Sequence, residues 1–131
     1  MNKVLTILFS LLLTTSTVFA KDMRFIQVDS SLYSTSNTKS FETLINKINS
    51  EKNVDFVVFT GDNIAKPNLK NLESFITQAK KLKSPFYVVL GNKDLNKQKE
   101  LSKKEYMKYL SENIRFYKKI DSPSYLFKKN N

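Results

Sequence analysis

The chain has 131 residues with no cysteine and no histidine, and its 22 Lys and Arg residues outnumber its 12 Asp and Glu residues, for a formal charge of +10. This composition excludes disulfides, thiolate metal sites and cysteine nucleophiles, and it equally excludes imidazole ligands, imidazole bases and Ser-His-Asp triads within the chain. Hydrophobic residues make up 40% of the chain, including 10 Phe and 6 Tyr, which is enough for a packed core. Any catalysis must therefore use carboxylates, lysine, tyrosine, hydroxyls or amides.

Residues 1–20 are predicted to be a secretory signal peptide. Lys3 precedes an apolar run from Val4 to Leu13, and Val18-Phe19-Ala20 offers residues suited to cleavage. An uncleaved membrane anchor is the weaker alternative, because the apolar run is too short to span a bilayer comfortably. We expect the mature chain to begin near Lys21 and to be exported to a periplasm or the medium, with no stable membrane anchor after cleavage.

Four short segments are predicted to be β-strands: Arg24–Val28, Val54–Thr60, Phe86–Leu90 and, near the end of the chain, Ser124–Phe127. The second and third segments are continuous apolar runs rich in β-branched and aromatic residues. Such runs are typical of strands that are buried on both faces of a parallel sheet.

Helices are predicted between these strands, because apolar residues recur there at spacings of three and four. They run from about Lys39 to Glu51, between Asn68 and Ser84, and from Lys103 to about Glu112. Ser102 and Glu105 are predicted to form a capping box at the start of the last helix. The resulting order, βαβαβαβ, specifies an α/β fold with mostly parallel strands.

The last predicted strand is followed by a turn and has no partner strand after it. We therefore expect residues 21–131 to be the N-terminal half of a larger, truncated domain. A small self-sufficient α/β protein is the alternative, and it would leave the last strand as an unprotected edge.

The two glycines of the chain occupy equivalent places. Gly61 and Gly91 each follow a predicted buried strand and precede Asp62 and Asn92, respectively, while Asp29 follows the first strand. Glycine permits a turn with positive φ, so neighbouring strand ends would present a carboxylate and a carboxamide side by side. Both groups are oxygen ligands for divalent cations. Ordinary Asx turns are the alternative explanation, but two such pairs favour a site.

The segments 56–63, FVVFTGDN, and 87–94, YVVLGNKD, resemble the second and third signatures of the calcineurin-like metallophosphoesterases. The signatures of that family run D-x-H, G-D-x-x and G-N-H-[DE], and the segment 24–29, RFIQVD, is similar to the strand that delivers the first of them. The resemblance implies a partial calcineurin-like phosphoesterase sandwich. It also implies phosphoester hydrolysis by water activated on two divalent metals, drawn from Mn, Fe, Zn or Mg.

The same resemblance implies roles for individual residues. Asp62 would bridge the metals, Asn92 would be a terminal ligand, and Asp29 would be the candidate ligand on the first strand. Asp94 matches the acidic residue that orients the histidine of G-N-H, and Lys93 replaces that histidine. Because the D-x-H histidine and the later G-H-x-H signature are absent from this chain, a tight dinuclear site is not expected. A weak, hydrated Mg²⁺ or Ca²⁺ site and a site with no bound metal both remain open.

Lys93 has two interpretations of its own. Its ammonium group, placed between Asp62 and Asp94, would neutralise these carboxylates without a metal and would hold a phosphate as a point charge. Alternatively, it is a solvated surface lysine. The first interpretation is favoured by the position of Lys93 inside the motif.

Two functional hypotheses follow. The first is a metal-dependent phosphoester hydrolase whose activity is weak or lost in this chain, and the second is a non-catalytic, exported pseudoenzyme that binds phosphate-bearing or anionic envelope ligands. The lysines that follow Lys93 would concentrate such anions near the site; they are Lys97, Lys99, Lys103 and Lys104. Nucleic acid is not an expected partner, because the aromatic residues mostly occupy core-facing positions and the chain is expected to be exported.

Overall fold

The computed structural model describes residues 22–95 and 100–114. The predicted signal peptide, Lys97, Lys99 and the predicted strand Ser124–Phe127 lie outside the described residues. Within the described ranges, no helix combines the length and the apolar character that crossing a bilayer requires.

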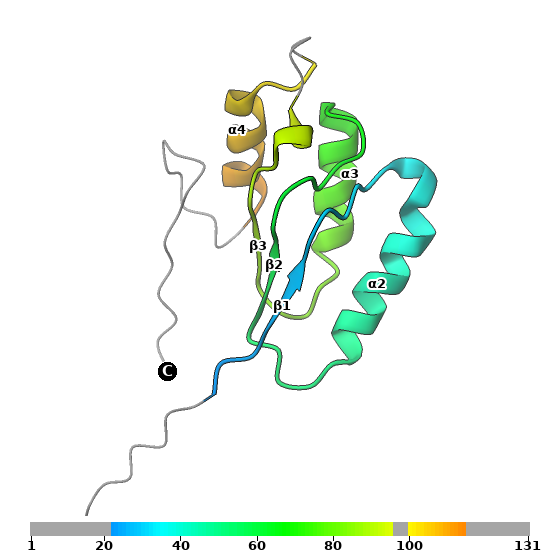
Figure 1. Cartoon of the computed structure of the whole chain (residues 1–131), viewed down its shortest axis with the longest axis vertical. Coiled ribbons are helices and arrows are strands. Elements are labelled where there is room, and N and C mark those ends of the chain that lie inside the picture. The colour runs from blue at the N-terminus through cyan, green and yellow to red at the C-terminus, as the bar shows by residue number, and fades with distance from the viewer. Residues whose placement is uncertain (1–21, 96–99, 115–131) are drawn as a thin grey trace, which may run out of the picture.

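The described residues alternate between strands and helices, as the sequence predicts (Figure 1). The elements, in chain order, are β1 (Phe25–Val28), the short 3₁₀ turn η1 (Thr35–Asn37), α2 (Thr38–Ser50), β2 (Phe56–Phe59), α3 (Leu69–Ala79), β3 (Phe86–Val88), the 3₁₀ turn η2 (Asn92–Asp94) and α4 (Lys103–Asn113). The predicted βαβαβα order is therefore confirmed as far as α4.

The three described strands form a parallel sheet in the order β1-β2-β3. Val28 of β1 is in register with Phe59 of β2, and Phe59 is in register with Val88 of β3. Because the strands are parallel and in register, their carboxyl ends lie at one edge of the sheet, where sites of open α/β sheets form. Both β2 and β3 end before the predicted Thr60 and Leu90, although Val89 still donates one ladder hydrogen bond to the Phe59 carbonyl (2.8 Å).

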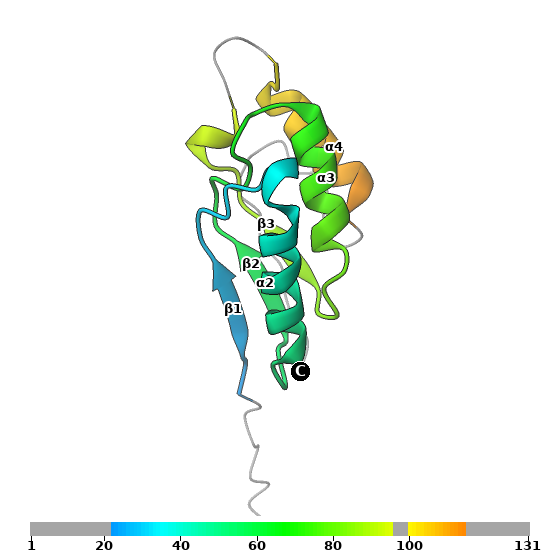
Figure 2. The ribbon, with the colours of Figure 1, turned by 90° about the vertical axis from the view of Figure 1, so that its right-hand side faces the viewer.

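The core lies between one face of the sheet and helices α2 and α3, which lie on the same side of it (Figure 2). Alternate strand residues such as Val57 and Phe59 point into this core and are fully buried. The aromatic ring of Phe59 contacts Phe75 of α3 edge to face, with ring centroids 5.1 Å apart. On the opposite face, the exposed ring of Phe25 stacks on Phe56 at a centroid distance of 5.2 Å.

Helix α4 begins with the predicted capping box. The Ser102 hydroxyl accepts a hydrogen bond from the Glu105 amide (3.2 Å), and the Glu105 carboxylate accepts one from the Ser102 amide (2.9 Å). The flanking residues Leu101 and Tyr106 are both buried, as expected for an apolar contact across a capped start. The cap thereby sets where α4 enters the core, and with it the position of Tyr106.

Candidate functional site

The ends of β2 and β3 approach each other through their two glycines. Gly61 has a φ of +112°, and Asp62 after it has a φ of +50°, a conformation that Asp tolerates better than most residues. A Cβ atom on Gly91 would overlap the Asp62 backbone nitrogen and lie 2.5 Å from Asp62 Oδ1. Gly61 is therefore needed for backbone conformation and Gly91 for space, and together they bring the two strand ends into contact.

Asp62 is engaged at both carboxylate oxygens by one residue. The backbone amide of Lys93 donates to Asp62 Oδ1 at 3.1 Å, and the Lys93 Nζ atom lies 3.4 Å from Asp62 Oδ2. The Asp62 side chain is only 16% exposed, whereas the Lys93 side chain is 63% exposed. The predicted proximity of the two turns is thus observed, with Lys93 as the residue that contacts Asp62.

The other two predicted ligands are exposed at the same edge of the sheet. Asn92 begins the η2 turn next to Lys93, and its side chain is open to solvent. Asp29 follows β1 and accepts a hydrogen bond from the Thr60 hydroxyl at 3.0 Å. The structure therefore places Asp29, Asp62 and Asn92 at the carboxyl ends of three neighbouring strands. Of these three side chains, Asp62 is the one that Lys93 contacts.

Asp94 has a different environment from the other acids, because it is fully buried. Its Oδ1 atom accepts hydrogen bonds from the backbone amides of Asn63 (2.6 Å) and Ile64 (3.0 Å). Its Oδ2 atom accepts from the Gly91 amide (2.8 Å) and the Asn63 side-chain amide (2.9 Å). Burial raises the pKa of Asp94, although these hydrogen bonds act in the opposite direction. In this position Asp94 ties the turn after β2 to the turn after β3.

Sequence reasoning missed Asn63 and Tyr106, which complete this buried network. Besides Asp94, the Asn63 side-chain amide donates to the Val89 carbonyl (2.8 Å) and to the Tyr106 hydroxyl (3.2 Å). Asn63 is fully buried, and its Oδ1 atom has no hydrogen-bond partner among the described residues. The one local sign of this role is that Asn63 stands between the G-D pair and the apolar Ile64, so a polar residue enters the core there. The network connects α4 to both strand ends.

The described residues do not fit a two-metal centre. Asp62 is already engaged by Lys93, and the oxygens of Asp94 already accept four hydrogen bonds. The other predicted ligands are Asn92 and Asp29, and Asp29 accepts a hydrogen bond from Thr60. Among residues 22–95 and 100–114, no group of three Asp, Glu, His or Cys side chains is placed to hold a metal ion. One hydrated hard cation on Asp62 and Asn92 is the most that this donor set could support, and it would compete with Lys93.

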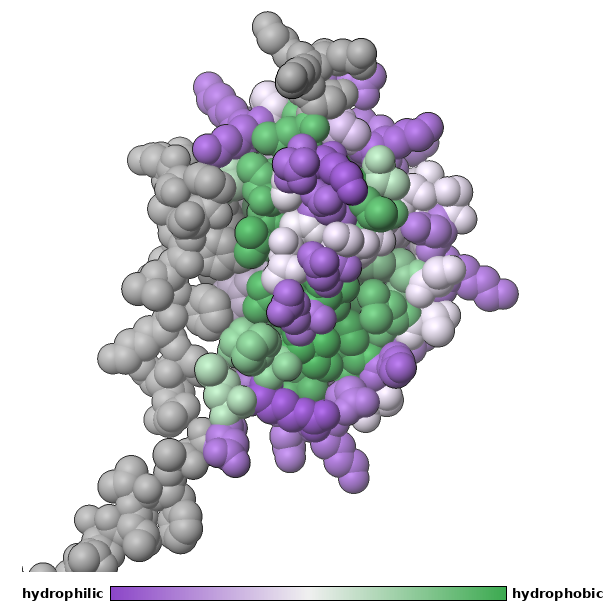
Figure 3. Space-filling model, viewed as in Figure 1, coloured by the Kyte–Doolittle hydropathy of each residue, from purple (hydrophilic) through white to green (hydrophobic). Residues whose placement is uncertain are grey.

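Hydrophilic residues cover the surface around this edge. Figure 3 shows hydrophilic residues gathered over the end of the sheet where η2 lies, and an apolar area lower on the same face. Helix α4 begins with two exposed lysines, Lys103 and Lys104, within one turn of Tyr106, whose hydroxyl contacts Asn63. The site therefore combines an exposed ammonium with positive charge nearby, an arrangement that attracts anions.

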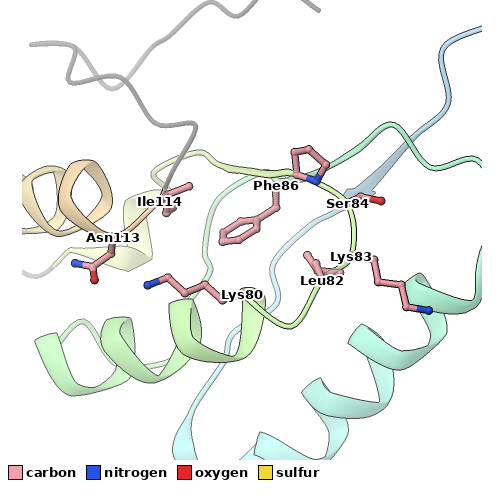
Figure 4. Close-up of a pocket in the computed structure, with 8 residues that line it drawn as sticks. Lys80, Leu82, Lys83, Ser84, Phe86, Asn113 and Ile114 are labelled. Atoms are coloured by element: carbon pink, nitrogen blue, oxygen red, sulfur yellow. The ribbon is translucent and has the colours of Figure 1, made fainter.

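A separate pocket of about 460 Å³ lies at the opposite end of β3, where the chain enters the strand from α3. In Figure 4, Phe86 and Ile114 point into the pocket, Lys80 extends toward Asn113, and Lys83 points away toward α2. None of the predicted site residues lines this pocket. The candidate site is thus an open strand edge and not this cavity.

The fold is a parallel α/β sheet with an acid and an amide at successive strand ends, and comparison with protein families identifies the class to which it belongs. The model for the calcineurin-like phosphoesterases matches residues 34–131, so the chain belongs to that family. The match begins after β1, so it includes Asp62, Asn92, Lys93 and Asp94 but leaves Asp29 outside. No curated protein matches the chain in sequence.

Proposed function

We propose that this chain binds phosphate-bearing ligands at the edge formed by the turns after β2 and β3, and that it hydrolyses them weakly or not at all. The observation that carries the proposal is the contact between Lys93 and Asp62. It leaves one ammonium group exposed at the position where the family signature has a histidine, and it engages the carboxylate that would otherwise bridge two metals.

The chemistry of the site supports binding more than turnover. Lysine holds a phosphate as a compact point charge and is a poor general acid at neutral pH unless its pKa is strongly depressed. Lys93 is mostly exposed, so its ammonium is available to a ligand in solution. The lysines at the start of α4 would add a general attraction for anions.

Metal-dependent phosphoester hydrolysis is the second candidate function. The specific observation in its favour is that Asp62 reaches the sheet edge through Gly61, as the G-D signature of the family requires. In that case Asp62, with Asn92 and Asp29, would hold a divalent ion that activates water and neutralises charge on the phosphoester. Other ligands would have to come from residues outside those described.

The location of the protein and the class of its ligands are also part of this proposal. The predicted signal peptide at residues 1–20 supports export to a periplasm or the medium, where small phosphoesters and anionic envelope polymers are the expected ligands. A formal charge of +10 is compatible with either kind of ligand. Nucleic acid and a stable membrane anchor are not part of this proposal.

The test of binding is a calorimetric titration of the chain with inorganic phosphate. We expect a dissociation constant in the millimolar range and a loss of affinity of about fivefold in Lys93→Met, because one exposed charge-assisted contact disappears. Lys47→Met is the matched control, since this exposed lysine lies in the last turn of α2, away from the carboxyl ends of the strands. Equal affinity of the Lys93 and Lys47 variants would contradict the proposal.

The competing function is tested on the same protein with nitrophenyl phosphate and bis-nitrophenyl phosphate. We expect little or no release of nitrophenol with or without Mn²⁺. Mn²⁺-dependent turnover that Asp62→Ala abolishes would instead establish hydrolysis. Turnover that needs no metal and survives Asp62→Ala would exclude this site as its source.

A further inference from the structure

The carboxylate of Asp62 has its charge balanced from within the chain. We propose that Lys93 is a built-in cation that takes the place of a divalent metal on Asp62, so that the ammonium group and a metal ion compete for this carboxylate. This inference concerns what sets the affinity of the site for metals, and it does not depend on whether the site binds phosphate.

Lys93 contacts both oxygens of the Asp62 carboxylate, an arrangement called the Lys93 clamp below. The amide of Lys93 donates to Oδ1 and its ammonium lies against Oδ2, at 3.1 and 3.4 Å. A metal ion on Asp62 would have to displace the ammonium from Oδ2. The Lys93 amide would stay in place, because it belongs to the backbone of the η2 turn and does not depend on the rotamer of the Lys93 side chain.

The η2 turn holds this clamp in place. The Asp94 carboxylate accepts a hydrogen bond from the Gly91 amide (2.8 Å), and the Asp94 amide donates back to the Gly91 carbonyl (3.3 Å). Since the turn is fixed, the base of the Lys93 side chain stays next to Asp62, and its ammonium competes as a tethered group at high effective concentration. A free cation has no such advantage.

The burial of Asp62 strengthens the competition. Its side chain is 16% exposed, so water screens its charge less than it would at an open surface. A divalent ion next to the ammonium would meet a like charge at short range. Lys93 can relieve part of this repulsion by swinging into solvent, because its side chain is 63% exposed. The ammonium should therefore weaken metal binding without abolishing it.

Removing the ammonium should expose a metal site that the wild-type chain suppresses. We expect Lys93→Met to bind Mn²⁺ about tenfold more tightly than the wild-type chain, since one like charge is removed at close range. Lys93→Arg keeps the charge and should stay near the wild-type affinity. Adding Asp62→Asn to Lys93→Met should cancel the gain, because the metal then lacks its carboxylate.

The experiment is a titration of each chain with Mn²⁺ alone, with free Mn²⁺ measured by electron paramagnetic resonance. Lys47→Met serves as the charge-matched control, and melting curves show that each variant is folded. The inference is overturned if Lys93→Met and Lys47→Met bind Mn²⁺ equally, if neither Lys93→Met nor Lys93→Gln binds it at all, or if the gain survives Asp62→Asn.

The same variant separates this inference from the proposed function. Lys93→Met should bind inorganic phosphate more weakly and Mn²⁺ more tightly. A gain in Mn²⁺ affinity with no phosphate binding by the wild-type chain would reject the proposed function and retain the built-in cation. Weaker phosphate binding by Lys93→Met with unchanged Mn²⁺ affinity would reject the built-in cation and retain the proposed function.

Discussion

Gly91→Ala is expected to destabilise the fold by about 3 kcal/mol, because the added methyl group has no space between the two strand ends. Its Cβ atom would overlap the Asp62 backbone nitrogen and lie 2.9 Å from the Gly61 carbonyl carbon. These are backbone atoms, so rotation of a side chain cannot relieve the clash. Chemical denaturation, followed by circular dichroism, measures the loss.

Gly61→Ala is the informative comparison, since the two glycines are needed for different reasons. Gly61 has a φ of +112°, which alanine rarely adopts, and its Cβ atom would be 3.0 Å from Gly91 Cα. Gly91 has a φ of −93°, so alanine there costs nothing in conformation and would even restrict the unfolded chain. If Gly91→Ala leaves the free energy of unfolding unchanged or raises it, the strand ends do not approach each other as closely as described.

This contact also controls the geometry of the site. Separating the two turns would draw the Lys93 amide and ammonium away from Asp62, because Lys93 lies two residues after Gly91. The folded fraction of Gly91→Ala should therefore bind phosphate more weakly than the wild-type chain, as Lys93→Met does. The close approach of the two glycines is what makes two separate turns into one site.

The elements of this fold were predictable where their determinants are local. Apolar spacing placed the first helix at about Lys39 to Glu51, and the structure has Thr38–Ser50. The capping box placed the start of α4 at Lys103, which the structure confirms. The predicted second and third strands ran one and two residues too far at their carboxyl ends, because the chain turns there toward the two glycines. The first and second strands also begin one and two residues later than predicted.

The site was predictable only in part, because its closest contacts join residues about 30 positions apart. Glycine placement indicated correctly that the turn at Asp62 lies against the turn at Asn92. It did not indicate that Asp94 is fully buried or that its donors include Asn63 and Ile64. No periodicity or spacing identifies which distant amides a carboxylate will accept from, and the same holds for Tyr106 and Asn63.

Asp94→Asn should cost about 3 kcal/mol of unfolding free energy at neutral pH, because a carboxamide cannot accept from all four donors. One of its two positions becomes an NH₂ group, which would face either the Asn63 and Ile64 amides or the Gly91 amide and the Asn63 side chain. Denaturant unfolding measures the loss, and Asp22→Asn, an exposed acid outside the network, should leave stability nearly unchanged.

The difference in unfolding free energy between the wild-type chain and Asp94→Asn should depend on pH, because burial changes the pKa of Asp94. Burial raises its folded-state pKa, so the folded chain holds the proton to a higher pH than the unfolded chain, and the contribution of Asp94 is greatest below its unfolded pKa of about 4. That contribution falls as the pH rises through the raised pKa. The part of the stability gap between the wild-type chain and Asp94→Asn that comes from this pKa difference should therefore shrink from acid toward neutral pH, and the lost acceptor then accounts for the loss expected at neutral pH. A gap that widens instead would mean that the four hydrogen bonds outweigh the cost of burial, which would make Asp94 a carboxylate stabilised by its surroundings.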